Sequence, residues 1–529
     1  MSRIAIVGSG LSALALARTL VARGVKPTVL DYGTTLQAKR QAVVERMSST
    51  RPNQWSLEDR KFVSDNATVH GRGTLPRKLA FGSDYFYADS LDQAETETDG
   101  VPLPHSYAKG GFSVGWGSSV LPPDDCDLRD WPLQRSDLET YFRRVLAQLP
   151  YSARDDGLSR HFPVYASHGK LLRSTGCCDD LLQRMNSVPE FGNEFVAFGR
   201  ARLLVRAEDD GTHPGCRYCG LCMSGCVYGC IHKSDQDLEA MLAAGQIDYE
   251  PGVLVHETSE VDGKVDVVLS RAGAAREVVS FDRVFLAAGA VGSTRIVLQS
   301  KRIHGREIRL LSTAGFVAPL FRLNRAKLQW PEVNTLPGLF LEFKVKDLSD
   351  HWVHTQIGTP NELVLEKLGV KWKAGGIVGR LKKRIAEHLI VAQCNLHSDH
   401  ANGYFLKIEQ NRGDRYGRLV SRREDGGVAV PAVRKTARTM LAIARRIGCY
   451  SMMPLLQNSL RSGGFHLGGT LPMRKNPQEE TDTNLLGNPR GWRRTHVVDS
   501  SIFPSLPGTT IGLLAMANAA RIGAETRLD

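Results

Sequence analysis

Apolar and polar residues at the start of the chain follow the order strand, tight turn, helix, strand. Residues 4–7, Ile-Ala-Ile-Val, form an uninterrupted apolar run like those of buried parallel strands. A glycine-rich turn and a helical pattern follow, and residues 29–31, Val-Leu-Asp, complete a second short strand. The pattern predicts a βαβ unit over residues 1–31, the opening unit of a Rossmann-like α/β domain.

Later segments extend this α/β pattern. Residues 137–149 place five apolar side chains on one side of a short helix, and 206–235 have the composition of a loop. Residues 284–288 form an apolar strand, and 511–526 form a final helix. Between 301 and 460 short apolar runs alternate with polar turns, which predicts a sheet with surrounding helices.

The turn after the first strand has the sequence of a dinucleotide-binding loop. Gly8-Ser9-Gly10-Leu11-Ser12-Ala13 is a G-x-G-x-x-A motif. Gly8 permits a tight turn, Gly10 leaves the backbone N–H groups open to a pyrophosphate, and Ala13 lets the helix pack closely on the strand. The helix directs the positive end of its dipole at the phosphates. Asp31 follows about 20 residues later, where an acid can bind a ribose hydroxyl. The unit alone does not separate FAD from NAD.

The overall composition is that of a soluble globular protein, with 42% hydrophobic and 23% charged residues among 529. The formal net charge of +12 favours an anionic substrate or an anionic membrane surface. The chain has no RNA-binding aromatic motif, zinc-finger spacing or basic tail, so we expect no nucleic-acid partner. It has neither a signal peptide nor an apolar run of about 18 residues, so we expect a cytoplasmic protein without a transmembrane helix.

Further segments carry a characteristic order of small, polar and apolar residues. Residues 109–117 are Lys-Gly-Gly-Phe-Ser-Val-Gly-Trp-Gly, and 284–295 are Val-Phe-Leu-Ala-Ala-Gly-Ala-Val-Gly-Ser-Thr-Arg. Residues 465–473, Phe-His-Leu-Gly-Gly-Thr-Leu-Pro-Met, lead to His-Val-Val-Asp-Ser-Ser-Ile-Phe-Pro at 496–504. In this order, and together with the βαβ unit, they resemble the glucose–methanol–choline family of flavin oxidoreductases. The resemblance implies that the dinucleotide is FAD. It covers residues 1–31, 105–135, 210–300 and 464–529.

The resemblance also implies a domain organisation. We expect an α/β fold with a Rossmann-like FAD-binding domain and a substrate domain built on a mostly antiparallel sheet with flanking helices. The FAD-binding domain is expected to combine residues 1–45, 105–135, 200–300 and 464–529. The substrate domain is expected to combine residues 136–199 and 301–463, and residues 46–104 are expected to form an irregular insertion or lid.

The resemblance implies cofactor contacts beyond the first loop. The glycine-rich segment is expected to follow the flavin, with Gly110, Gly111, Ser113 and Gly117 close to it. The turn at Ala288 and Gly289 is expected near the pyrophosphate and adenosine, and Asp499 near the ribityl chain or pyrophosphate. Further expected contacts are Val253, Thr510 and Ile511.

A histidine in the family's H-x-x-G-T segment lies above the flavin, and here that residue is His466. A neutral imidazole can take the proton of a hydroxyl while hydride moves to flavin N5. The family pairs this histidine with an asparagine or second histidine, but the matching position here is Thr510. Threonine can orient a substrate but cannot act as a base at neutral pH.

These residues imply oxidation of a CH–OH group in a small-molecule alcohol such as a sugar, a polyol or a sterol-like compound. Two alternatives stay open. The threonine in place of a second base favours a reductase of a C=C or C=O bond, fed with electrons through an iron–sulfur cluster. The same fold also hosts lyases, so a flavoprotein without net redox chemistry is the other alternative.

Five of the ten cysteines lie within fifteen residues. They are Cys216, Cys219, Cys222, Cys226 and Cys230, and the first four have the spacing C-x2-C-x2-C-x3-C of ferredoxin-type ligands. Some flavin dehydrogenases that resemble the family carry a three-iron cluster at a similar place, so we expect a 3Fe–4S or 4Fe–4S cluster. A zinc site and a loop of buried thiols are the alternatives. A cluster would make the protein a dehydrogenase that passes electrons to an external acceptor, such as a redox protein or a quinone.

Residues 367–389 combine basic and apolar side chains. Such a segment forms either a solvated helix face or a peripheral contact with an anionic membrane, here the inner membrane face. The basic residues are Lys367, Lys371, Lys373, Arg380, Lys382, Lys383 and Arg384, and the apolar residues between and after them are Trp372, Ile377, Val378, Leu381, Ile385 and Leu389.

Overall fold

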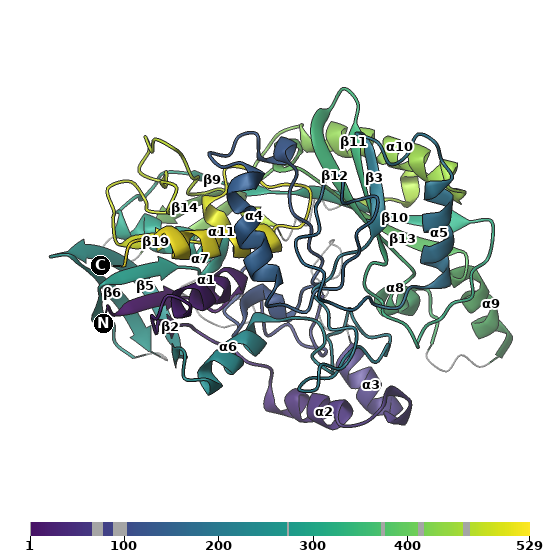
Figure 1. Cartoon of the computed structure of the whole chain (residues 1–529), viewed down its shortest axis with the longest axis horizontal. Coiled ribbons are helices and arrows are strands. Elements are labelled where there is room, and N and C mark those ends of the chain that lie inside the picture. Colours follow the sequence, from purple (N-terminus) through teal and green to yellow (C-terminus); the bar gives the residue numbers. More distant parts are fainter. Residues whose placement is uncertain are drawn as a thin grey trace.

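A computed structural model describes residues 2–65, 78–87, 103–271, 274–371, 376–410, 417–458 and 466–528. Two large sheets organise the molecule and lie at opposite ends of its longest axis (Figure 1). One is parallel and contains the N-terminal strand, and the other is antiparallel and is built mostly from the middle of the chain.

The parallel sheet has five strands in the order β19-β8-β1-β2-β4. Their apolar side chains are buried on both faces, as the uninterrupted apolar runs predict. Val7 of β1 pairs with Leu30 of β2 and Leu286 of β8, so the carboxyl ends of these strands meet at one edge. The strands are β1 (Ile4–Val7), β2 (Thr28–Leu30), β4 (Asp248–Glu250), β8 (Arg283–Leu286) and β19 (Thr495–Val497).

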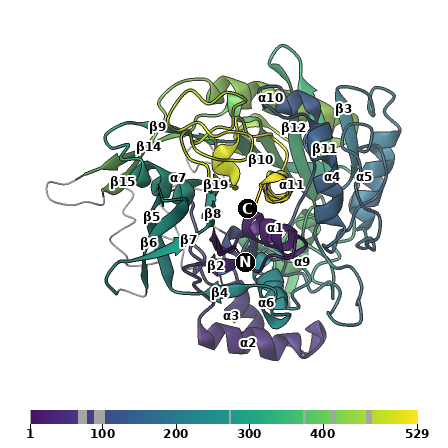
Figure 2. The same ribbon diagram turned by 60° about the vertical axis from the view of Figure 1, so that its left-hand side comes forward.

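Helices and a small antiparallel sheet cover this parallel sheet. Helix α11 lies along α1 and contacts α4 on its other side, while α7 packs on β5 (Figure 2). One hydrophobic core includes residues from all of these elements. The elements are α1 (Leu11–Val21), α4 (Arg135–Leu146), α6 (Ser234–Ala243), α7 (Gly289–Ser300), α11 (Gly512–Glu525) and the meander β5 (Val253–Val261), β6 (Lys264–Arg271) and β7 (Glu277–Phe281).

The second large sheet has seven strands, ordered β16-β10-β13-β12-β11-β3 with β17 also paired to β10. One face packs against helices α5 (Gly176–Asn186) and α10 (Ala429–Arg446) in a separate core. The other face carries polar side chains along its central strands. The strands are β3 (Val196–Arg200), β10 (Ala314–Arg322), β11 (Leu339–Val345), β12 (Ser349–Gly358), β13 (Leu389–Leu396), β16 (Cys449–Tyr450) and β17 (Gln457–Asn458).

A four-stranded sheet, ordered β15-β14-β9-β18, joins the two ends of the molecule. Its strand β9 runs on into β10 of the large antiparallel sheet, while β18 belongs to the C-terminal segment. Leu467 of β18 pairs with Ser312 of β9, which brings the C-terminal segment beside the antiparallel sheet. The strands are β9 (Ile308–Ser312), β14 (Tyr404–Glu409), β15 (Arg418–Arg423) and β18 (Leu467–Gly468).

The packing differs from the expected domain boundaries in two places. Helix α4, expected in the substrate domain, packs on α11 and shares the core of the parallel sheet. Residues 46–104 are also not uniformly irregular, because α2 (Ala38–Ser48) ends there and α3 (Leu57–Ser64) lies within them. Only a few apolar residues, among them Met47 and Val63, anchor these helices, so their pattern in the sequence is weak. The rest of this segment falls largely outside the described residues.

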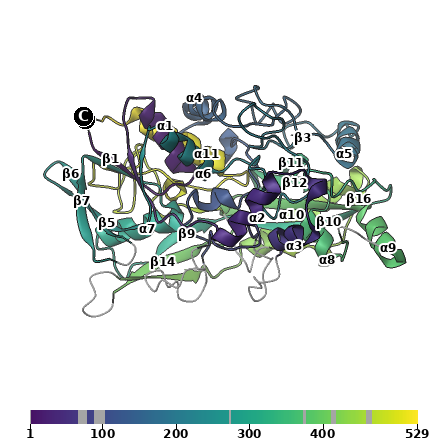
Figure 3. The same cartoon turned by 90° about the horizontal axis from the view of Figure 1, so that it is seen from below.

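Two shorter helices, α8 (Glu362–Lys367) and α9 (Gly376–Ala386), follow β12. They lie at the end of the molecule opposite the parallel sheet (Figures 1 and 3). Within the described ranges, no helix combines the length and the apolar character needed to cross a bilayer.

Candidate active site and cysteine cavity

The glycine-rich turn lies at the carboxyl edge of the parallel sheet. Gly8 has a φ of +100°, and a Cβ at this position would lie 2.5 Å from the carbonyl oxygen of Ala287. Any side chain here would therefore collide with the end of β8. By contrast, a Cβ on Gly10 would meet no atom within 4 Å, so the backbone of the turn borders open space.

The N-terminus of α1 is available to an anion. Among the described residues no side chain caps it, and the first amide to donate within the helix is that of Leu14, to the carbonyl of Gly10 at 3.1 Å. The N–H groups of Leu11, Ser12 and Ala13 precede that bond. Unsatisfied amides and the helix dipole together form a phosphate-binding end. This geometry fits the pyrophosphate of a dinucleotide.

Asp31 follows β2 at the same edge and is buried. Its carboxylate accepts hydrogen bonds from the Ser9 hydroxyl at 2.5 Å and the Tyr249 hydroxyl at 3.3 Å. Burial raises its pKa to about 6, against the opposing effect of these hydrogen bonds. The backbone N–H of Val253 donates to the Asp31 carbonyl, so these two residues are adjacent.

The segment 110–117 packs directly on the first turn. Gly110 and Gly111 have φ angles of +88° and +58°, and a Cβ on Gly111 would lie 3.4 Å from the Cα of Gly10. The Ser113 hydroxyl donates to the Gly110 carbonyl and accepts from the Ser234 N–H, which fixes the segment to the start of α6. At Gly117 the nearest atom to an added Cβ is a Leu336 carbon at 3.7 Å. The 110–111 end is thus packed against protein, whereas Gly117 leaves space beside the backbone.

The hydrogen-bond partners of Asp499 are protein groups of α7 and the C-terminal segment. Its carboxylate accepts from the Ser293 hydroxyl at 2.5 Å and the Ser501 hydroxyl at 2.6 Å. Burial raises its pKa, while these bonds and the Gly289 N–H oppose the rise. Asp499 therefore holds the start of α7, with Ala288 and Gly289, against the C-terminal segment. These contacts fix the position of the turn at 288–289.

His466 directly precedes β18 and lies near the polar face of the large antiparallel sheet. Burial, with a smaller contribution from His354, lowers the pKa of His466 to about 4. At neutral pH the ring of His466 is therefore uncharged, as a proton acceptor requires.

His354 belongs to a fully buried pair that the sequence analysis missed. Its Nδ1 lies 2.6 Å from Oε1 of Glu342 on the neighbouring strand, and both side chains are completely buried. Its Nε2 lies 3.2 Å from Nε2 of Gln356, two residues along β12. With Glu342 ionised, Nδ1 carries the proton and Nε2 accepts from the Gln356 amide. The alternation of His354 and Gln356 with apolar residues was the available signal in the sequence.

Thr510, the position matching the family's second base, has a different partner. Its hydroxyl oxygen accepts from the backbone N–H of Leu121 at 3.2 Å. Ile511 comes next and precedes α11, at whose first residue, Gly512, a Cβ would lie 2.9 Å from the Trp116 ring. Thr510 and Ile511 thus join the start of α11 to the segment that follows Gly117.

All five clustered cysteines line one small cavity of about 10 Å³. Nearly all the lining comes from the loop between β3 and α6, and Asn334 supplies the rest. Thiolates on a single zinc ion lie about 3.8 Å apart, because Zn–S bonds are about 2.3 Å long. No three of the cysteine sulfurs, all within the described ranges, come within 4.8 Å of one another. The sulfurs are therefore spread more widely than the thiolates around a single ion.

Several sulfurs in this cavity accept hydrogen bonds from N–H groups. Cys226 accepts from the Cys230 amide at 3.2 Å, Cys222 from the Thr335 amide at 3.4 Å, and Cys216 from the Asn334 side chain at 3.6 Å. Bonds from Cys230 lower the pKa of Cys226 to about 6, whereas burial raises the pKa of Cys222. Amide-to-sulfur bonds of this kind stabilise thiolate ligands.

Two ionisable side chains, the buried Glu362 and the half-buried Lys78, flank the cysteine loop. The Glu362 carboxylate accepts from the N–H groups of Met223 and Ser224 at 2.6 and 2.9 Å, and so holds the loop against α8. Lys78 donates to the Trp116 carbonyl at 2.8 Å, and burial lowers its pKa to about 8 although Glu362 and the thiols of Cys222 and Cys226 favour its charge. A cation is thus placed between the cysteine cavity and segment 110–117.

The cysteine loop is also tied directly to the predicted flavin segment. The indole N–H of Trp116 donates to the carbonyl of His232 at 2.6 Å, and His232 is two residues beyond Cys230. Only a few bonds therefore separate the lining of the cysteine cavity from Gly117.

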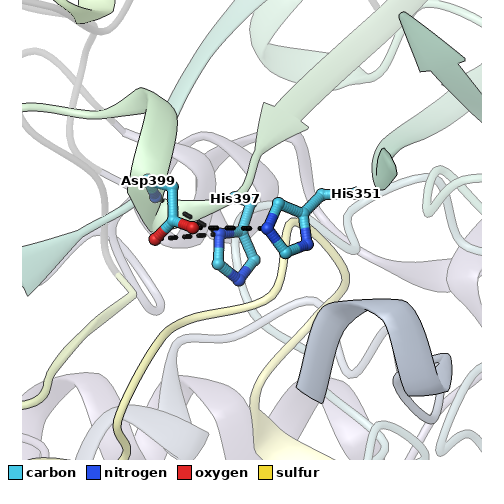
Figure 4. A group of neighbouring side chains, drawn as sticks. All are labelled: His351, His397 and Asp399. Atoms are coloured by element: carbon cyan, nitrogen blue, oxygen red, sulfur yellow. Dashed lines mark hydrogen bonds and ion pairs between the residues drawn. The ribbon is translucent and has the colours of Figure 1, made fainter. Parts of the chain in front are cut away.

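His351, His397 and Asp399 form the one group among the described residues whose ligand atoms all lie within 4.8 Å (Figure 4). The two rings are stacked, with centroids 3.7 Å apart and planes 6° from parallel. Their in-plane lone pairs therefore lie in separate planes and cannot meet at one ion. Nδ1 of His397 also accepts from the Asp399 amide. The three side chains therefore interact with one another through hydrogen bonds and an ion pair.

Two neighbouring carboxylates favour the protonated form of His351. Its ring lies 3.4 Å from Asp127 and 3.3 Å from Asp399. Burial opposes protonation, but the hydrogen bonds to these two carboxylates raise the pKa of His351 to about 9. A charged imidazole therefore bridges β12 to residues 125–128 and 398–400, where the two ends of the molecule meet.

Comparison with known proteins identifies the fold. No family model matches the chain, and no curated protein does. Among solved structures, the chain is similar to pyridoxine 4-oxidase from Mesorbium loti, with 14% identity, a TM-score of 0.59, and coverage of 99% of this chain and 98% of that chain. The likeness extends over both sheets. It confirms the expected fold class, an α/β protein with a Rossmann-like unit and an antiparallel sheet flanked by helices.

Proposed function

We propose that this protein, built on a fold it shares with pyridoxine 4-oxidase, is an FAD-dependent oxidoreductase that oxidises a CH–OH group of a small-molecule alcohol. The observation that carries the proposal is the placement of two histidines, the half-buried His466 and the fully buried His354, toward the polar face of the sheet that borders the dinucleotide-binding edge. Phe340 and Trp352 of that face share a core with Val114 of segment 110–117.

The residues at the edge of the parallel sheet would hold FAD. The amides of Gly10 to Ala13 would bind the pyrophosphate, Asp31 a ribose hydroxyl, and segment 110–117 the flavin ring. When bound, FAD supplies a hydride acceptor at N5. Gly8, Ala288, Gly289 and Asp499 support this site through the backbone, because they fix how closely the ends of β1 and β8 approach.

His466 and His354 would handle the proton of the alcohol. The uncharged ring of His466 accepts the hydroxyl proton as the C–H bond breaks. Glu342 would hold the ring of His354 in one orientation through Nδ1–H, and the substrate hydroxyl would replace the Gln356 amide at Nε2. His354 would thus take the place of the second base that the family carries at the position of Thr510.

Anaerobic reduction of the bound flavin by a panel of alcohols tests this function. The panel contains pyridoxine, glucose, sorbitol and a sterol, and bleaching of the flavin absorbance is the readout. We expect one class to reduce the wild-type flavin, and His466→Ala to slow that reduction by about 10²–10⁴-fold while retaining FAD. No reduction by any of these alcohols, or full-rate reduction of the His466→Ala variant, would contradict the proposal.

We further propose that the cysteine cavity holds an iron–sulfur cluster, which makes the protein a dehydrogenase. Five cysteines around one cavity, amide-to-sulfur hydrogen bonds and the neighbouring Lys78 cation support this. When bound, the cluster supplies a one-electron carrier between the flavin and an external acceptor. The Trp116–His232 bond would keep that path short.

Metal analysis of anaerobically purified protein tests the cluster separately from the alcohol chemistry. We expect three or four irons per chain, little zinc and a paramagnetic resonance signal. Cys222→Ser should lower the iron content, whereas Cys394→Ser, a buried cysteine of the antiparallel sheet, should leave it unchanged. Zinc instead of iron, or no metal in the wild type, would contradict the proposal.

A further inference from the structure

Helix α9 has its apolar side chains on the side away from the protein. Of its residues only Ala386 is buried. The exposed fractions of Ile377, Val378, Leu381 and Ile385 are 78%, 66%, 58% and 47%. At 100° per residue these four positions occupy one face about 100° wide. An amphipathic helix normally buries such a face against its own core, but α9 does not.

The adjacent face of α9 is basic. Arg380, Lys383 and Arg384 are exposed and occupy neighbouring positions around the helix, while Lys382 folds back toward Gly369. In the described part of the chain no carboxylate forms an ion pair with any of these four cations. The apolar face is therefore bordered by cations that carry uncompensated charge, within a protein of net charge +12.

Exposed apolar side chains continue beyond the helix. Leu323, at the end of β10, is 76% exposed. It is held beside the segment after α9 by the hydrogen bond from the Arg322 N–H to the His388 carbonyl. Phe321 and Tyr450 form an exposed cross-strand pair next to it. Soluble monomers rarely gather this much apolar surface at one end without a partner.

We propose that α9 is a peripheral membrane-docking helix, with its apolar face in the interface of an anionic bilayer and its cations at the lipid phosphates. An exposed apolar face bordered by Lys and Arg is the pattern of helices that lie in a membrane interface. The helix stands at one extremity of the molecule (Figures 1 and 3), where a flat surface can reach it without touching the parallel sheet.

Charge complementarity favours a membrane over a second copy of this chain. A symmetric contact through α9 would bring the unpaired cations of both copies together, whereas anionic headgroups neutralise them. The location also suits electron transfer to a lipid-phase acceptor. Val370, which follows α8, shares a small core with Ala386 of α9, and α8 begins at Glu362, which holds the cysteine loop.

Co-sedimentation of the full-length holoprotein with vesicles tests the docking helix. One set of vesicles contains phosphatidylglycerol and phosphatidylcholine, and the other phosphatidylcholine alone. Binding is measured at about 0.1 M and about 1 M salt, where the Debye length falls from about 10 Å to about 3 Å. We expect binding to the anionic vesicles at low salt and a large loss at high salt.

Variants test the basic face and the apolar face of α9 separately. Replacing Arg380, Lys383 and Arg384 by Gln should weaken binding about a hundredfold, from about 1 kcal/mol for each cation at the surface. A matched control replaces three exposed cations on α10, whose apolar face is buried, and should leave binding unchanged. The control residues are Arg434, Arg438 and Arg445.

Replacing Ile377 and Leu381 by Ser should also weaken binding, whereas Val278→Ser, at an equally exposed site on β7, should not. All substituted side chains are on the surface, so folding is retained and circular dichroism verifies it. Absence of binding by the wild type at low salt, or equal binding by the α9 and α10 variants, would overturn the proposal. Loss of self-association in the Ile377 and Leu381 variant without vesicle binding would assign the face to a second copy instead.

Discussion

The parallel and antiparallel sheets build their parts of the candidate site in opposite ways. At the edge of the parallel sheet the site is backbone, with glycines and a helix N-terminus, and side chains mostly stay out of it. On the face of the antiparallel sheet it consists of side chains, with Glu342, His354 and Gln356 linked across neighbouring strands. The backbone part depends on glycines that have no side chain, whereas the other part depends on hydrogen bonds between pairs of side chains. The two parts should therefore fail differently when altered.

The largest expected effect comes from adding one methyl group at Gly8. Gly8→Ala places a Cβ 2.5 Å from the Ala287 carbonyl oxygen at a positive φ, which should cost about 2–4 kcal/mol of unfolding free energy. Thermal unfolding and FAD content should both fall. Gly10→Ala is the matched control, because its Cβ meets no protein atom. It should keep the stability and lose FAD. Equal stability of both variants would contradict the steric account.

Breaking the buried pair should have the next largest effect. His354→Leu leaves Glu342 buried without its partner and should cost about 3–5 kcal/mol, measured by denaturant unfolding. Adding Glu342→Leu should restore most of that stability, because an apolar pair of similar volume replaces the buried hydrogen-bonded pair. Alcohol-driven flavin reduction should stay low in both variants. If the double variant recovered reduction together with stability, His354 would have only a structural role.

The smallest expected effect is the pH dependence of the contact that His351 makes with Asp127 and Asp399, between the two ends of the molecule. The folded-state pKa of His351 is about 9, above the ordinary 6.5, so its stabilisation is fully present below pH 6.5 and is lost as the pH rises through about 9. The melting temperature of the wild type should fall over this range. His351→Gln should melt lower at pH 6 and show a flatter profile. Parallel profiles would exclude His351 as the cause.

The sequence predicted the parallel half well because its signals are local. The turn Gly8–Ala13, the acid at Asp31 and the strand 284–286 each lie within a few residues of the elements that they define, and the structure places all three at one edge. The cysteine spacing is equally local, and the five thiols it groups line one cavity, although ligation of a cluster stays a prediction.

The remaining features depend on pairing across long stretches of chain. Glu342 meets His354 only through the register of β11 and β12, and His354 approaches His466 only through the pairing of β18 with β9. A helical pattern likewise does not show which sheet a helix packs near, and α4, expected in the substrate domain, packs on α11. For α9 the pattern of residues was recognised, but the direction of its apolar face depends on the fold around it.

The position of the cysteine loop has a consequence for cooperativity. The backbone of Gly220 donates to Val333, Cys222 bonds Thr335, and Ser224 bonds Glu362. A group bound by the cysteines would therefore cross-link the loop before α6, and through it stabilise the contacts of that loop with residues 333–335 and Glu362. Oxidation of the cysteines or removal of the bound group should weaken this cross-link. Calorimetry should then show two unfolding transitions where the intact protein shows one.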